Sequence, residues 1–250
     1  MPLIGLVLMK HTRDKSLEFA KTICAAWKDT RSCDCKAYQR RFLFVNAWAA
    51  YNTAKSYWIL HENKCFDDCV ILARNLLERI FNSACAAKSP THAVELISHE
   101  LTEKIRHAKQ CSPNAQAQLT PSINEHEKIL QTLLGLMKKM KAPQWSYRRR
   151  AEAAGLVAYY LSGYFSFSRY AHAGYEVPRP EKQNQQSNAA DFIALVAPVL
   201  TAANYHAVDC PDFRQGKCDV HAESMALLQD ISLRTLGNNN GDIGIQKDKA

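Results

Sequence analysis

Four polar residues share one face of a predicted helix over residues 146–172. These residues are Tyr160, Tyr164, Ser168 and His172, and each follows the previous one after four positions. His172 lies in the last turn of that helix, where the negative end of the helix dipole favours a protonated imidazole. A histidine in this place could exchange protons near neutral pH. Alternatively, His172 only caps the helix and Ser168 only bonds back to a backbone carbonyl, and the spacing leaves both interpretations open.

A pair of opposite charges lies on a second, strongly apolar segment. Arg74 and Glu78 are separated by four positions and therefore share a helix face. Residues 66–81 are apolar nearly all round, so at least one of the two charges is expected to be partly buried and paired. A purely structural ion pair satisfies this pattern. A functional interpretation gains support because the polar residues of 146–172 form a second such set on another helix.

Basic residues cluster at the predicted junction of two helices, around Pro143 and Trp145. The cluster comprises Lys138, Lys139, Lys141, Arg148, Arg149 and Arg150. Arginines beside an aromatic ring suit contacts with phosphates and bases, which makes RNA a candidate partner. A charged helix junction is also commonly just a solvated surface. The net charge of +8 permits nucleic-acid binding without requiring it.

Two histidines and two cysteines near the C-terminus have the chemistry of zinc ligands but no recognised spacing. They are His206, Cys210, Cys218 and His221, with three, seven and two residues between them. We predict no metal and no cofactor, although the sequence leaves metal binding by this group open. The chain also lacks a glycine-rich phosphate loop and a Gly-x-Ser-x-Gly nucleophile turn.

Apolar residues recur every three to four positions over most of the 250-residue chain, which predicts an all-α protein. We expect a multi-helix bundle of about eight helices, over 14–29, 38–62, 66–88, 91–109, 123–141, 146–172, 189–207 and 219–235. Ser122 follows Pro121 and precedes Glu125 by three positions, which matches a capping box and predicts a helix start there. Ser89-Pro90-Thr91 predicts the end of one helix and the N-cap of the next.

Composition divides the chain into a core and a C-terminal appendage. We expect a helical core domain over 1–175, a polar linker with two prolines over 176–188, and a helical pair over 189–236 that packs on the core. Residues 237–250 have almost nothing to bury and are expected to be disordered.

The cytoplasm is the predicted location of the chain. The apolar run at the N-terminus precedes its charge, the reverse of a secretion signal, and no segment holds the ~18 uninterrupted apolar residues of a membrane span. We therefore expect no membrane association. The nine cysteines are odd in number and several lie in apolar helical patterns, which favours reduced thiols over disulfides.

The residues singled out above also resemble a known helical family, domain of unknown function 5677. The similarity extends roughly over residues 38–175. Its most specific parts are the Arg-x-x-x-Glu helix of Arg74 and Glu78 and the Ser-x-x-x-His helix end of Ser168 and His172. Because this family is functionally uncharacterised, the resemblance implies a helical fold and candidate positions but no reaction.

More distantly, the chain is similar to the helical HEPN ribonucleases of toxin and antiphage systems, which implies a HEPN-like core. Those enzymes carry Arg-x(4–6)-His, whereas Arg169 precedes His172 by only three positions, so Arg74 could supply the cation from another helix. The resemblance implies metal-free RNA cleavage, in which His172 moves the proton of a ribose 2′-hydroxyl and an arginine stabilises the phosphorane charge. Glu78 would orient either group.

The HEPN resemblance further implies a homodimer with the site at its interface. The alternative function is that of a non-catalytic helical module that binds a partner protein, nucleotide or nucleic acid. In that case Arg74, Glu78 and His172 would form a structural polar network.

Overall fold

The computed structural model describes residues 2–27, 32–164, 167–168, 180–209 and 219–239. These residues form helices and include no strand, which confirms the predicted all-α bundle. The helices are α1 (Pro2–Ala25), α2 (Cys35–Glu62), α3 (Phe66–Lys88), α4 (Pro90–Lys109), α5 (Pro113–Met137), α6 (Tyr147–Ala154), α7 (Val157–Tyr159), the π-helix η1 (Tyr160–Tyr164), α9 (Pro180–Asp209) and α11 (Asp219–Asn239).

Serine caps mark the starts of two helices that flank the candidate site. Ser89 caps α4 by accepting a hydrogen bond from the backbone N–H of His92 at 3.1 Å, as predicted. Pro90 occupies the first helical position, where a missing N–H costs nothing. Ser146 caps α6 in the same way through the N–H of Arg149 at 3.2 Å. These local signals separate α3 from α4 and set the start of α6.

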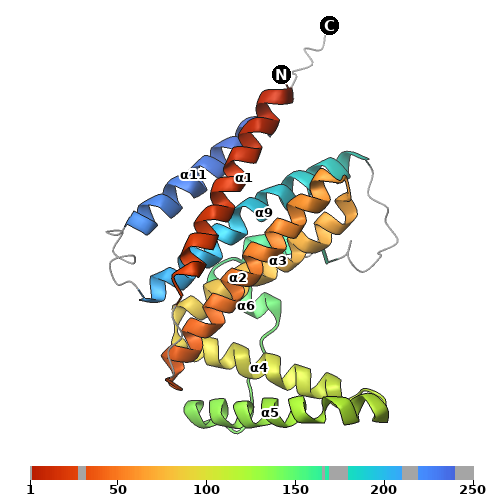
Figure 1. The fold of residues 1–250 in the computed structure, drawn as a ribbon, viewed down its shortest axis with the longest axis vertical. Helices are drawn as coiled ribbons and strands as arrows, with labels where there is room; N and C mark the ends of the chain where they lie inside the picture. Colours follow the sequence, from red (N-terminus) through yellow and green to blue (C-terminus); the bar gives the residue numbers. More distant parts are fainter. Residues whose placement is uncertain (1, 28–31, 165–166, 169–179, 210–218, 240–250) are drawn as a thin grey trace, which may run out of the picture.

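Helix α9 lies in the core of the bundle. It packs against α1, α2, α3 and α11, and its buried residues join theirs in one apolar core. Figure 1 shows α9 running between the α1–α11 pair and the α2–α3 pair. The helix predicted over 189–207 thus packs on the core as expected, and its buried residues belong to the same core cluster as those of α2 and α3. The helix also begins at Pro180 rather than near residue 189, because the Glu, Lys and Gln residues after that proline are good helix formers.

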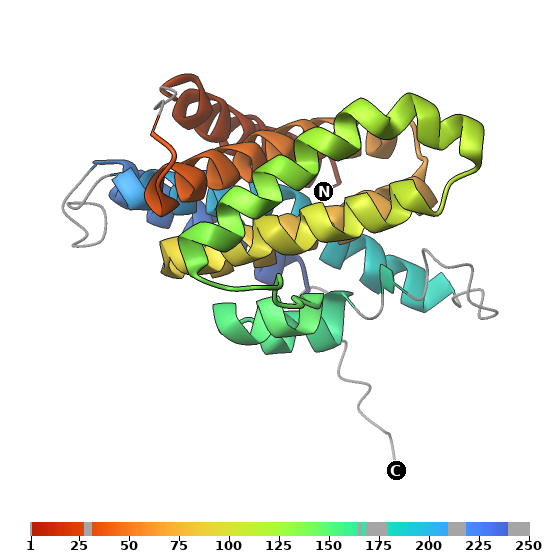
Figure 2. The ribbon, with the colours of Figure 1, turned by 90° about the horizontal axis from the view of Figure 1, so that it is seen from below.

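Helices α4 and α5 form a hairpin that projects from the rest of the bundle (Figures 1 and 2). The hairpin has its own small buried cluster of Val94, Leu101 and Leu133. Helix α5 begins at Pro113 and continues through Pro121, so the start predicted from Ser122 is wrong. The Ala, Gln and Leu residues before Pro121 favour helix and extend it past a proline that removes one backbone hydrogen bond.

The helix predicted over 146–172 is broken at Gly155. This residue ends α6 in the left-handed region with φ 77°, and the N–H of Leu156 returns to the carbonyl of Ala151 at 2.7 Å. A glycine in this conformation is a common helix end. The chain then forms α7 and η1, so Tyr160 and Tyr164 lie on a π-helical turn rather than on a continuous α-helix.

Helices α1 and α9 are both long, and each contains an apolar stretch. Helix α1 begins at Pro2 rather than near residue 14, because the apolar N-terminal run continues the helix. The stretch Asn188–Val208 of α9 is long and apolar enough to cross a membrane by length and composition alone. However, 67% of that stretch is buried inside the bundle, as in a helix that packs against several neighbours.

Candidate functional site

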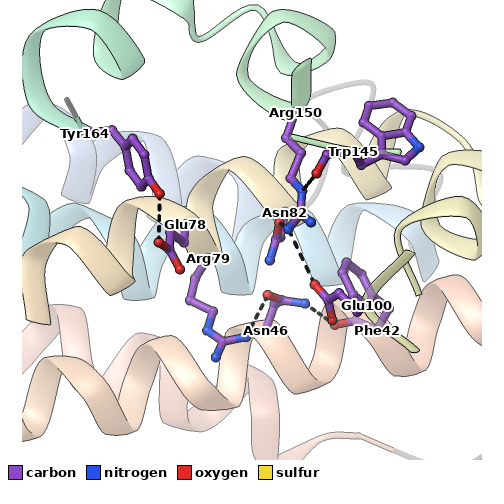
Figure 3. Close-up of polar contacts among 9 residues, drawn as sticks. All are labelled: Phe42, Asn46, Glu78, Arg79, Asn82, Glu100, Trp145, Arg150 and Tyr164. Atoms are coloured by element: carbon purple, nitrogen blue, oxygen red, sulfur yellow. Dashed lines mark hydrogen bonds and ion pairs between the residues drawn. The ribbon is translucent and has the colours of Figure 1, made fainter. Parts of the chain in front are cut away.

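One face of α3 carries a row of three polar residues, Arg74, Glu78 and Asn82, spaced by four positions on a helix whose buried residues are mostly apolar. The chain from Trp145 onward lies across this row. Figure 3 shows Tyr164 above Glu78 and Arg150 above Asn82. The row therefore has two halves, one around Arg74 and Glu78 and one around Asn82.

Arg74, Glu78 and Tyr164 contact one another in a closed triangle. The Tyr164 hydroxyl donates to Oε1 of Glu78 at 3.1 Å, and Nη2 of Arg74 donates to that hydroxyl at 3.3 Å. Nε of Arg74 lies 3.4 Å from Oε1 of Glu78, which confirms the predicted pairing of the two charges. The Arg74 and Glu78 side chains keep 21% and 18% of their surface exposed, so both reach solvent.

Burial and charge set the protonation states within the triangle. Burial lowers the pKa of Arg74, but its hydrogen bond with Tyr164 and the charge of Glu78 outweigh that effect and raise the pKa overall. Burial raises the pKa of Tyr164; the Arg74 hydrogen bond opposes this shift and the Glu78 charge adds to it. At neutral pH Arg74 therefore carries a positive charge, and Tyr164 keeps its proton as a donor to Glu78.

Two further tyrosines, Tyr147 and Tyr160, pack against Tyr164 of the triangle. The rings of Tyr160 and Tyr164 are stacked with centroids 5.3 Å apart, and the ring of Tyr147 lies 5.3 Å from Tyr164 on another side. The ring of Phe81 of α3 packs against the rings of both Tyr160 and Tyr164. Burial and the nearby Glu78 charge raise the pKa of Tyr147, so its hydroxyl also stays protonated. The carboxylate of Glu78 thus faces a cluster of aromatic rings that can donate hydrogen bonds. The rings of Tyr147, Tyr160 and Tyr164 are called the tyrosine wall below.

The π-helical turn brings this wall onto α3. Gly163 lies so near α3 that a Cβ in its place would be 3.2 Å from Cδ1 of Leu77, tighter than an ordinary contact. Turns of this type are rare and occur often at functional sites. The structure therefore places Tyr164 directly beside Arg74 and Glu78, with the ring of Tyr160 stacked on that of Tyr164.

The other residues predicted to be catalytic, Ser168, Arg169 and His172, follow Tyr164 in the sequence. Ser168 is half-buried and follows Phe167, which is buried in the main core. Arg169 and His172 lie outside the described residues. Their convergence with Arg74 and Glu78 accordingly stays a prediction.

Arg150 belongs to the protein interior rather than to an exposed basic surface. Its side chain is 3% exposed, which differs from the expectation of a nucleic-acid contact. The guanidinium donates to the carbonyl of Trp145 at 3.0 Å and to Oδ1 of Asn82 at 2.6 Å, and it stacks on the Tyr147 ring at 4.6 Å. It also lies 3.5 Å from a carboxylate oxygen of Glu100. Arg150 thereby ties α6 to α3 and α4.

The other predicted nucleic-acid contacts are exposed. Lys138 ends α5 in the left-handed region with φ 53°, and Lys139 forms an ion pair with Glu95 of α4. Arg148 pairs with Glu152 at 2.9 Å.

Arg149 lies 4.6 Å from the centre of the Trp145 ring and donates to the carbonyl of Gln144 at 2.8 Å. Arg148 and Arg149 follow Tyr147 on α6 and so lie next to the tyrosine wall in the chain.

Sequence reasoning missed two residues at the site, Asn82 and Tyr147. Asn82 had a signal, because it continues the spacing of Arg74 and Glu78 by one more turn. Tyr147 had none, since its contact with Tyr164 depends on how α6 packs against η1.

The candidate zinc ligands are only partly within the described chain. His206 and His221 are half-buried, whereas Cys210 and Cys218 lie outside the described residues. Among the residues described, no group of three or more His, Cys, Asp or Glu side chains is arranged to hold a metal ion.

Comparison with known proteins gives one match. Residues 42–180 match the family described as "Family of unknown function (DUF5677)", and this range covers more than half of the 250-residue chain and contains the whole Arg74–Glu78–Tyr164 triangle. No curated protein and no solved structure matches the chain. The resemblance seen in the Arg-x-x-x-Glu helix and the residues that follow is thus confirmed, and the chain belongs to the DUF5677 family.

Proposed function

We propose that this protein is a HEPN-like, metal-independent endoribonuclease effector of a toxin or antiphage defence system. The observation that carries the proposal is the triangle of Arg74, Glu78 and Tyr164, a partly exposed guanidinium held in place on an apolar helix. A cation held in this way is suited to an anionic group such as a phosphodiester.

Arg74 would bind a non-bridging phosphate oxygen and stabilise the charge that grows there in the transition state. Its raised pKa keeps it charged, and its contacts with Tyr164 and Glu78 limit the side-chain freedom that binding would otherwise remove. Glu78 and Tyr164 are positioning residues in this proposal.

His172 would move the proton. The ribose 2′-oxygen attacks phosphorus while its proton passes to the imidazole, and the bond from phosphorus to the 5′-oxygen breaks. The imidazolium then returns that proton to the leaving 5′-oxygen, which yields a 2′,3′-cyclic phosphate and a free 5′-hydroxyl. No redox partner is needed, and the proton and electron pairs balance within the substrate and His172.

RNA would approach over α6. Arg148 and Arg149 are exposed and follow Tyr147, which lies against Tyr164. Their charges would hold the backbone on either side of the reacting phosphate. Lys138 and Lys139 at the end of α5 would extend this basic surface.

The proposal includes a cytoplasmic homodimer. Six cysteines of the described chain are free thiols, which supports a reducing compartment; they are Cys24, Cys35, Cys65, Cys69, Cys85 and Cys111. Light scattering of the purified chain tests the dimer, and a monomer at micromolar concentration would contradict it.

Incubation of labelled RNA with the full chain and excess chelator tests the nuclease. Wild type is expected to cleave, whereas Arg74→Ala and His172→Ala should each lose at least about 100-fold in rate. Arg106→Ala is the matched control, because Arg106 pairs with Glu103 on α4, outside the site. Absence of cleavage by wild-type protein, or equal rates for Arg74→Ala and Arg106→Ala, would remove the proposal.

The second candidate function is a non-catalytic binding module. One observation favours it: each of Arg74, Glu78 and Tyr164 already has the other two as partners. In that case the wild-type protein would not cleave RNA, and Arg74→Ala would lower the free energy of unfolding.

A further inference from the structure

A buried carboxylate lies away from the triangle, where α9 crosses the C-terminal end of α2. Asp191 of α9 is 5% exposed. The hydroxyl of Tyr57 donates to its Oδ1 at 2.5 Å, and Nε2 of His61 lies 3.5 Å from the same oxygen. Tyr57 is fully buried, whereas the His61 side chain keeps 28% of its surface exposed. The imidazole thus connects a buried acid with solvent.

Aromatic rings hold His61 in this position. Its ring lies 6.1 Å from that of Tyr57, 5.5 Å from that of Trp58 and 5.5 Å from that of Phe66. His61 also lies in the last turn of α2, next to the end of the helix that α9 crosses.

The thiol that α3 contributes beside this group is neutral. Cys69 donates to the carbonyl of Tyr57 at 3.6 Å. Burial, with the charges of Asp191 and Asp68 and the neighbouring Cys65, raises the pKa of Cys69 to about 11. It therefore offers Asp191 no positive charge.

The cationic side chains of α1 near this group interact with other carboxylates. Arg13 lies over the Trp58 ring at 5.9 Å and forms ion pairs with Asp14 and Glu62. Arg13 lowers the pKa of Glu62, and the positive charge of Lys10 adds a smaller effect in the same direction.

On α11, which also packs against α9, Asp230 accepts a hydrogen bond from Thr12 of α1 at 3.3 Å. Within the described part of the chain, His61 is therefore the cationic partner placed at Asp191.

Ionisation of Asp191 is costly inside the bundle. Burial raises its pKa, while the Tyr57 hydrogen bond and the positive charge of His61 lower it. The buried carboxylate of Asp191 needs both the Tyr57 hydrogen bond and the charge of His61, because an unpaired charge in the interior is strongly unfavourable. Loss of the His61 proton would remove one of them.

We propose that Asp191, His61 and Tyr57 form a pH-responsive latch that holds α9 against the C-terminal end of α2. The latch is closed when His61 is protonated, since its charge then offsets that of the carboxylate. As pH rises and His61 loses its proton, Asp191 keeps only the Tyr57 hydroxyl, and the docking of α9 weakens. This latch is independent of the proposed nuclease function.

Amide hydrogen exchange of the full chain tests the latch. Exchange is followed by mass spectrometry from about pH 6 to about pH 8, the range in which histidines titrate, with rates corrected for the intrinsic effect of pH. Wild-type peptides around Asp191 are expected to lose protection roughly tenfold across this range, as for a coupling of about one pKa unit. His61→Gln should remove most of that change.

Two further variants sharpen the test. Asp191→Asn should show a flat profile, because an amide oxygen still accepts from Tyr57 but carries no charge. His107→Gln is the matched control, since His107 is an exposed histidine 4.0 Å from Glu103 on α4, and it should behave as wild type. The latch is overturned if His61→Gln keeps the wild-type pH dependence, or if α5 loses protection in wild type as much as α9 does.

Discussion

Tyr164 of η1 and Glu78 of α3 are joined by a hydrogen bond of 3.1 Å, although 86 positions separate them in the chain. This bond places the π-helical turn on the polar row of α3 and brings the Tyr164 hydroxyl to the Arg74 guanidinium. The cluster is therefore held together by contacts among its own three side chains, and an anion that enters it would share Arg74 with Glu78.

Tyr164→Phe should destabilise the protein, because it removes the hydrogen bonds of the Tyr164 hydroxyl. It leaves the stacked ring but removes the hydroxyl from Glu78 and Arg74, so the free energy of unfolding is expected to fall by about 1–2 kcal/mol. Urea denaturation measures the change. Tyr159→Phe is the control, because Tyr159 is 50% exposed, and it should change stability by less than about 0.5 kcal/mol. Equal effects would show that the Tyr164 hydroxyl contributes nothing specific.

Arg150→Met should be strongly destabilising, whereas Arg148→Met should not. Arg150 is buried and holds Asn82 and the Trp145 carbonyl, so its loss is expected to cost about 3 kcal/mol. The Arg148 side chain is 69% exposed in its pair with Glu152, and such surface pairs contribute only about 0–1 kcal/mol. Thermal unfolding of the two variants distinguishes the roles, and similar melting temperatures would contradict them.

Two glycines offer opposite outcomes for the same substitution. Gly155→Ala forces a side chain into φ 77° at the end of α6 and should cost about 1 kcal/mol. Gly135→Ala meets open space inside α5 and should stabilise by about 0.5–1 kcal/mol. Chemical denaturation of both variants gives the comparison. A stabilising Gly155→Ala would mean that α6 does not end in the described conformation.

Thiol labelling should divide the cysteines by burial. Burial raises the pKa of Cys24 and Cys85 to about 11, and burial is also the main cause of the same shift in Cys69. At about pH 8 these thiols should resist iodoacetamide, whereas the exposed Cys33 and Cys111 should react. Mass spectrometry of the native and the urea-unfolded chain checks this pattern. Rapid native labelling of Cys85 would contradict the packing of α3.

Asp191→Asn should gain stability relative to wild type as pH rises. Burial raises the folded-state pKa of Asp191, so its contribution is fully present below the unfolded pKa and is lost as pH rises through the folded one. The asparagine variant should therefore differ little from wild type near about pH 4 and be the more stable protein near about pH 8. Urea midpoints across this range test the sign, and a constant difference between the two proteins would contradict it.

The sequence by itself determined the helical class of this protein and the pairing of Arg74 with Glu78. Both follow from local geometry, because residues four positions apart share a helix face whatever the rest of the chain does. The serine cap before Pro90 is local in the same sense. Ser122 and Glu125 show where local patterns fail. Their spacing matches a helix start, but both residues lie inside α5, because the residues before them also favour helix.

Only the tertiary structure decided which partners the paired charges meet. The burial of Arg150, the position of Tyr147 beside Tyr164, and the meeting of Asp191 with His61 all join residues that are distant in the chain. The place of α9 in the core is decided in the same way. Such contacts depend on which apolar faces pack together, and local spacing specifies a face of a helix but not the neighbour that covers it.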